Sequence, residues 1–172
     1  MSNPIPEKLI NFNVYDDTEK LVGVSGEVTL PNFEAVTETI SGAGIAGEFE
    51  SATPGHFGSQ TIEITFRTMM DKSFSLMKNR GRSIVFRGAQ QIYDTAVGRS
   101  VAKKVKVTLR GQPKGLELGK MAVGQPTDTK NTLEILYIKI EVDDRVMLEF
   151  DKLNFVFIVD GEDILGQIRN MI

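Results

Sequence analysis

The amino-acid sequence has no cysteine and only one histidine, His56. Without cysteine the chain cannot form disulfide bonds, thiolate metal sites or cysteine nucleophiles. The histidine stands among glycines and has no cysteine partner, so we expect an exposed loop side chain and not a general base. Both observations argue against catalysis based on a thiolate or an imidazole.

Long hydrophobic runs and an excess of one charge are missing as well. Lys and Arg number 20 against 23 Asp and Glu, so composition alone does not indicate nucleic-acid binding. The apolar run Phe155 to Val159 is too short to span a bilayer, and the N-terminus lacks a signal-peptide core. We expect a chain that is soluble and cytoplasmic when made, without stable membrane association, and that forms a single domain over residues 1–172.

Alternation of apolar and polar residues indicates that strands dominate the fold. In Thr61 to Arg67 the residues Ile62, Ile64 and Phe66 share one face, as in a half-buried strand. The same alternation from Val101 to Arg110 predicts a second strand. Further strands are expected at 133–142, 146–150 and 153–159, the first two joined by a tight hairpin at Asp143 and Asp144.

Two short helices are predicted beside these strands. Asp71 to Asn79 begins with an N-cap type of residue and stops before Gly81. Near the C-terminus, Ile164, Leu165 and Ile168 recur at helical spacing.

The segment from about 31 to 59 is rich in glycine and too long for an ordinary connection, so we expect a loop that packs on a neighbouring molecule. Gly42, Gly44 and Gly47 match the dinucleotide-binding pattern G-x-G-x-x-G. That pattern requires a helix after the third glycine, whereas Pro54 and Gly55 follow here and exclude one. A nucleotide site is therefore not expected.

Other polar clusters have simple structural explanations. The aspartate pairs at 16–17 and 143–144 lack the repeated acidic spacing of a calcium loop and fit turns better. Lys104, Lys106 and Arg110 form a basic stripe on one strand face, which is more typical of a solvated or subunit-contacting face than of a phosphate site. We therefore predict no catalytic, cofactor-binding or metal-binding residues.

The order and spacing of several short elements resemble a known family, the tail tube proteins of contractile phages and phage-derived bacteriocins. The elements begin with Thr29–Pro31, continue with the three glycines of the loop, and reach Leu109–Gly111. The similarity is most specific at the end of the chain, in Asp151, Asn154, Gly161, Asp163, Leu165, Gln167 and Arg169.

This resemblance implies a β-sandwich or partly rolled barrel of antiparallel strands with a flanking helix. It implies hexameric rings that stack into a hollow tube inside a sheath, capped by baseplate and tail-terminator proteins. Tape-measure protein or DNA would occupy the lumen transiently, and the tube would conduct DNA in a phage or ions in a bacteriocin. The location would be the virion tail or bacteriocin particle, assembled in the host cytoplasm.

Two residue sets are expected to mediate assembly. The loop residues Gly42, Gly44, Ile45, Gly47 and Phe49 are expected at contacts between rings, so deleting 41–59 should spare the subunit fold and abolish tube growth. The basic stripe is expected to face a neighbour or the sheath, because a basic lining would retain DNA. The main alternative is a monomeric β-barrel that binds a small ligand in an apolar pocket, and an enzyme on a β scaffold is a more distant one.

Overall fold

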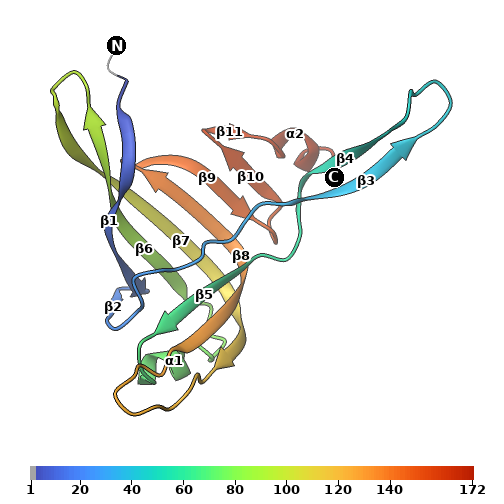
Figure 1. Cartoon of the computed structure of the whole chain (residues 1–172). Helices are drawn as coiled ribbons and strands as arrows, with labels where there is room; N and C mark the ends of the chain where they lie inside the picture. The colour runs from blue at the N-terminus through green and yellow to red at the C-terminus, as the bar shows by residue number, and fades with distance from the viewer. Residues whose placement is uncertain (1–2) are drawn as a thin grey trace.

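The computed structural model describes residues 3–172, which form mainly antiparallel β structure with two short helices (Figure 1). One sheet has nine strands in the order β11-β10-β9-β8-β7-β6-β1-β2, with β5 also paired to β8, and a second sheet contains β3 and β4. The elements are β1 (Ile5–Asp16), β2 (Glu19–Leu21), β3 (Ala35–Ser41), β4 (Glu48–Phe57), β5 (Thr61–Phe66), α1 (Asp71–Ser75), β6 (Ser83–Asp94), β7 (Arg99–Glu117), β8 (Thr129–Val142), β9 (Arg145–Asp151), β10 (Val156–Val159), β11 (Glu162–Asp163) and α2 (Gly166–Arg169).

The large sheet has one apolar and one polar face, as the alternating sequence predicts. Opposite residues of neighbouring strands bury together: Phe86 stands across from Val107, and Leu109 across from Ile138. The predicted strand from Thr61 is confirmed as β5, in which Ile62, Ile64 and Phe66 are 0% exposed. Burying an aliphatic or aromatic side chain of this size stabilises the fold by roughly 1.5–3 kcal/mol.

Strand β8 pairs with two different strands along one of its edges. Its first half pairs with β5 and its second half with β9, while β7 runs along its other edge. The register between β7 and β8 shifts at Gly111, which lies opposite a bulge in β8 and where an added Cβ would lie 2.1 Å from the Glu134 carbonyl oxygen. Only glycine fits this bulge, because that approach is far inside van der Waals contact.

The sheet curls over its apolar face but does not close into a barrel. The chain after β2 crosses that face and meets β5 through two isolated bridges, Val24 with Phe66 and Thr29 with Glu63. The core therefore lies between the curled sheet and this crossing segment. The expected class of mainly antiparallel β structure with two short helices is confirmed, and the sheets stay open.

The hairpin predicted at Asp143 and Asp144 is confirmed. Both residues have positive φ angles, 48° and 64°, which is the backbone of a type I′ turn between β8 and β9. Aspartate tolerates this conformation better than most residues, because its short side chain can bond to nearby backbone groups.

The predicted boundaries of α1 and of the last strand were too generous. The helix expected over Asp71–Asn79 ends at Ser75 and continues only as single turns. The strand expected from Leu153 begins at Val156, because the Asp151 carboxylate accepts hydrogen bonds from the amides of Leu153 and Asn154 and holds a turn there.

The prediction of an irregular loop over 31–59 was wrong. Residues Ala35–Ser41 and Glu48–Phe57 form the hairpin β3–β4, which projects from the body of the molecule at the upper right of Figure 1. The sequence hides this hairpin because polar and small residues interrupt the apolar ones on both strands, so apolar alternation is weak. The glycines that suggested a loop lie at its tip and its base.

Candidate assembly surfaces

The β3–β4 hairpin stands alone as a two-stranded sheet, and within the described residues its strands pair only with each other. Ile40 stands opposite Phe49, so these two residues share a face, and Phe49 is 54% exposed. An isolated two-stranded hairpin is marginally stable in water. Glu38 and Ser51 lie on this face too, so Ile40 and Phe49 form a local apolar spot that is suited to contact with another chain.

The opposite face of the hairpin is acidic. Glu48 and Glu50 alternate with Phe49 along β4 and stand across from Ser41 and Thr39. The chain has four glutamates and no lysine or arginine from residue 34 to 57. The hairpin therefore carries an unbalanced negative charge on an exposed arm.

The base of the hairpin is fixed to the core. The Phe57 ring lies 5.1 Å, centroid to centroid, from both Phe150 and Phe157, in edge-to-face contacts. Beside it, a Cβ on Gly55 would lie 2.4 Å from a Leu165 methyl group. The arm thus projects from a rigid aromatic anchor, and a deletion as far as Ser59 would remove core residues as well as the arm.

The loop residues singled out from the sequence lie at or near the hairpin tip. Gly44 and Gly47 have φ angles of 87° and 97°, which favour glycine, and nothing lies within 4 Å of a Cβ built on Gly42, Gly44 or Gly47. Their role in contacts between rings stays a prediction.

The C-terminal residues of the family pattern come together beside the hairpin base. Leu165 is fully buried, Arg169 donates a 3.1 Å hydrogen bond to the Phe155 carbonyl oxygen, and Gly161 takes a φ of 85° in the β10–β11 turn. Asn154 donates to Asp151 over 2.7 Å, and Arg169 also bonds Asp163 and lowers the pKa of that carboxyl group. Gln167 is exposed on α2. Apart from Gln167, these residues fasten the end of the chain.

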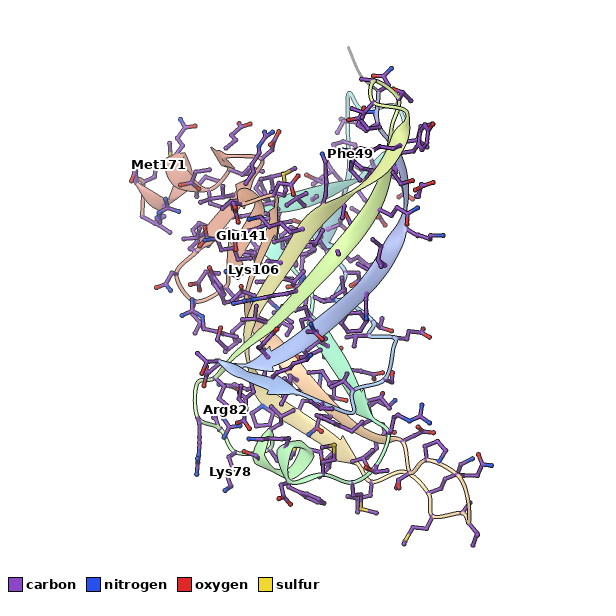
Figure 2. All side chains as sticks on the ribbon, turned by 90° about the vertical axis from the view of Figure 1, so that its left-hand side faces the viewer. Phe49, Lys78, Arg82, Lys106, Glu141 and Met171 are labelled. Carbon is purple, nitrogen blue, oxygen red and sulfur yellow. The ribbon has the colours of Figure 1, made fainter. Side chains whose placement is uncertain are left out.

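The basic stripe lies on the polar face of β7, but that face is charge-balanced. The Lys106 ammonium lies 3.4 Å from the Glu141 carboxylate, as Figure 2 shows near the middle of the sheet, and Lys104 pairs with Asp144. The Arg110 guanidinium lies 4.0 Å from the centroid of the Tyr137 ring. Each cation of the stripe therefore has a partner within its own subunit.

Tyr137 is the strongest electrostatic anomaly on this face. Partial burial and a 2.9 Å hydrogen bond from its hydroxyl to the Glu149 carboxylate raise its pKa to about 12. Both effects favour the neutral phenol, the first by removing water and the second by placing an anion next to the oxygen.

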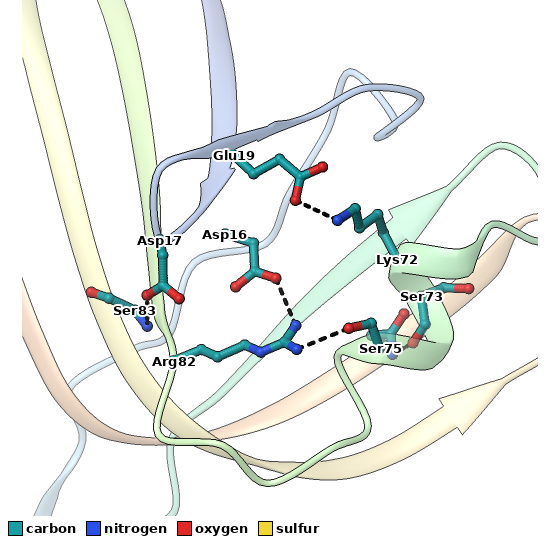
Figure 3. Close-up of polar contacts among 9 residues, drawn as sticks. Asp16, Asp17, Glu19, Lys72, Ser73, Ser75, Arg82 and Ser83 are labelled. Atoms are coloured by element: carbon teal, nitrogen blue, oxygen red, sulfur yellow. Dashed lines mark hydrogen bonds and ion pairs between the residues drawn. The ribbon is translucent and has the colours of Figure 1, made fainter.

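A second cluster, which sequence reasoning missed, fixes the segment between α1 and β6 (Figure 3). Arg82 donates hydrogen bonds of 2.7 Å to the buried Asp16 carboxylate and 2.9 Å to the Ser75 hydroxyl. Burial raises the pKa of Asp16 in spite of this cation. Beyond the cluster, Lys78 and Arg80 are exposed, and their side chains have no hydrogen-bond or ion-pair partner among the described residues.

The sequence contains a pattern that indicates this basic segment between α1 and β6. Between Lys72 and Asp94 the chain has four further cations and no acidic residue. Lys78 lies at the lower end of the molecule in Figure 2, whereas Phe49 of the hairpin lies near the top. The acidic arm and the basic segment therefore occupy opposite ends.

Two other regions expose apolar side chains. Leu9 and Ile10 on β1 are about half exposed, and Met121 in the loop between β7 and β8 is 89% exposed. An apolar cleft of about 180 Å³ lies between β1, β6, β7 and the crossing segment at Val28 and Leu30. Ligand pockets usually measure roughly 300–1,000 Å³, so this cleft is small for the ligand-binding alternative.

Within residues 3–172, no group of three or more His, Cys, Asp or Glu side chains is arranged to hold a metal ion. Neither helix in the described part of the chain is long and apolar enough to cross a membrane. The described residues do expose apolar and charged surfaces that are suited to contacts with other protein chains.

Comparison with known proteins identifies the family of the chain. The chain belongs to the family described as phage tail tube protein FII, which it matches over residues 6–172. It is 29% identical over 172 residues to the tail tube protein of Escherichia phage P2, covering 98% of each chain. It is 25% identical to the major tail tube protein of Serratia phage KSP20, covering 93% of this chain and 91% of the relative.

A solved structure shares the fold. This is a chain in the cryo-electron microscopy structure of the sheath/tube terminator of the PVC extracellular contractile injection system in its extended state. The TM-score is 0.56 at 14% identity, over 79% of this chain and 96% of the other.

Proposed function

We propose that this protein is the subunit of the inner tail tube of a contractile injection particle, in which hexameric rings stack into a hollow tube inside the sheath. The observation that carries the proposal is the projecting β3–β4 hairpin, which exposes Phe49 and whose strands pair, within the described residues, only with each other. Membership of the tail tube family supports a tube as the assembly in which the hairpin would be covered by another subunit.

The open sheet supports ring formation. Strands β2 and β11 end the long sheet, and such edges leave backbone groups available for pairing with another chain. Closure into a ring satisfies every edge with an identical neighbour. The polar sheet face, the hairpin and the exposed Leu9 and Ile10 of β1 would then face the lumen, the neighbouring rings or the sheath.

The basic stripe serves in this proposal as a contact with a neighbouring subunit or the sheath. Each of these cations, Lys104, Lys106 and Arg110, already has a partner in its own subunit. A paired cation costs less free energy to bury at an interface than an isolated one.

Sheath, baseplate and terminator proteins are the partners that a tube of this kind requires. The tube is assembled in the host cytoplasm and driven through the target envelope when the sheath contracts, with DNA or ions passing through the lumen. No catalytic step enters this function.

The test is electron microscopy of the purified protein at increasing concentration, with light scattering to measure mass. Rings or hollow tubes of uniform width are expected. A protein that stays monomeric at every concentration, even when preformed tail tube ends are added as seeds, would contradict the proposal and favour the ligand-binding alternative.

A further inference from the structure

Exposed side chains of opposite charge lie at the two ends of this subunit. At one end, Glu48 and Glu50 lie on the outer face of the projecting hairpin. At the other, Lys78 and Arg80 lie in the exposed turns between α1 and β6. A subunit whose ends differ in this way has the polarity that head-to-tail stacking needs.

The acidic end has no cation of its own to neutralise it. The sequence from Leu21 to Phe66 contains no lysine or arginine, so within the arm the carboxylates cannot pair locally. Residues 41–54, which include the whole tip, are exposed. An arm of this kind is suited to meet a basic surface on another molecule.

The basic end is held in a defined position. Arg82 is tied to Asp16 and Ser75, and the backbone amide of Ser83 donates a 3.1 Å bond to the Asp17 carboxylate (Figure 3). These bonds occupy the Arg82 side chain, whereas the side chains of Lys78 and Arg80 are exposed to solvent. A pre-positioned pair of cations loses less entropy on binding than a mobile one.

Apolar residues accompany the charges at both ends. Ile45 at the hairpin tip is exposed, and Phe74 on α1 is 47% exposed within the same turn-rich segment as Lys78. The two surfaces therefore match in both charge and apolar character, which is the pattern of a specific interface.

From these observations we infer that the acidic hairpin of one subunit docks on the α1–β6 segment of a second copy in the next ring, with Glu48 and Glu50 against Lys78 and Arg80. The inference rests on the proposed function, since it names the pairing that joins stacked rings. It also gives tube growth a salt dependence, because exposed charges are screened within about 10 Å at 0.1 M salt.

The test is a charge swap between two full-length variants, Glu48→Lys/Glu50→Lys and Lys78→Glu/Arg80→Glu. Each is first checked for an unchanged thermal unfolding midpoint. Each alone should form tubes only at a concentration at least about tenfold above wild type, because every ring junction repeats the lost pairs. An equimolar mixture should recover tubes, since the lysines of one variant then face the glutamates of the other.

A control carries Glu27→Lys, which reverses the charge of an exposed residue away from both surfaces. It should assemble like wild type. If both swap variants assemble like wild type, if only one is impaired, or if their mixture fails to recover, the pairing is wrong although tubes form. If wild type itself forms no rings or tubes, the proposed function fails, and the pairing with it.

Discussion

The Arg82 guanidinium and the Asp16 carboxylate form a largely buried ion pair, 2.7 Å from nitrogen to oxygen, that joins the start of β6 to the end of β1. The partners are far apart in the sequence, so the pair closes a long loop that contains β2, the hairpin, β5 and α1. It also determines where the basic segment of the α1–β6 turns is displayed.

Replacing Arg82 with alanine should lower the free energy of unfolding by about 3 kcal/mol, because it leaves the Asp16 carboxylate buried without its cation. Urea unfolding of the isolated subunit measures this. Arg80→Ala is the matched control, since Arg80 is an exposed arginine two residues away and should change stability by less than about 0.5 kcal/mol. Equal stability of the two variants would show that the pair contributes little.

Tyr137 should ionise with a pKa of about 12, because burial and the Glu149 carboxylate both oppose its charged form. The folded state therefore keeps a proton that the unfolded state loses near pH 10. Stability contributed by this phenol is present below pH 10 and is lost as pH rises toward 12.

Absorbance titration of tyrosinate in the folded protein tests this value. The chain has three tyrosines, so Tyr137→Phe should remove the latest transition and thereby assign it. Glu149→Gln should lower that pKa by removing the anion next to the hydroxyl. A titration in which Tyr137→Phe removes an ordinary transition near pH 10 would contradict the predicted environment.

Periodicity predicted the strands that have a continuous buried face. Ile62, Ile64 and Phe66 alternate without interruption, and the local turn chemistry of Asp143 and Asp144 located a hairpin correctly. Such features depend on neighbouring residues, so sequence alone carries them.

The remaining features depend on contacts between distant residues or on another molecule. The bond between Arg82 and Asp16 joins positions that no local pattern connects. The β3–β4 hairpin has little core of its own, so its strands lack the apolar alternation on which strand prediction rests. The C-terminal residues were recognised as a pattern, but their fastening role required the fold around Leu165 and Gly55.

Gly111 is predicted to tolerate no side chain. Alanine at this position would place its Cβ 2.1 Å from a backbone oxygen of β8, which cannot move without distorting the sheet. We expect a loss of about 3 kcal/mol, at the upper end of overpacking effects. Gly26→Ala is the control, because nothing lies within 4 Å of a Cβ there. Thermal unfolding of both variants tests the difference, and equal midpoints would contradict it.

The arm of the hairpin should be dispensable for folding and required for tubes. Thr37 pairs with Ala52, so replacing residues 38–51 by Asn-Gly closes the strands with a two-residue turn and keeps Gly55 and Phe57 in place. The exposed arm contributes no side chain to the buried core, so the unfolding midpoint of the variant should stay close to that of wild type. Electron microscopy should then show no tubes at concentrations where wild type assembles, because the surface that reaches a second copy is gone. Tubes of normal width from this variant would mean that stacking rests on other surfaces, such as Leu9 and Ile10 on β1 or the loop at Met121, and would shift the search for ring contacts to those residues.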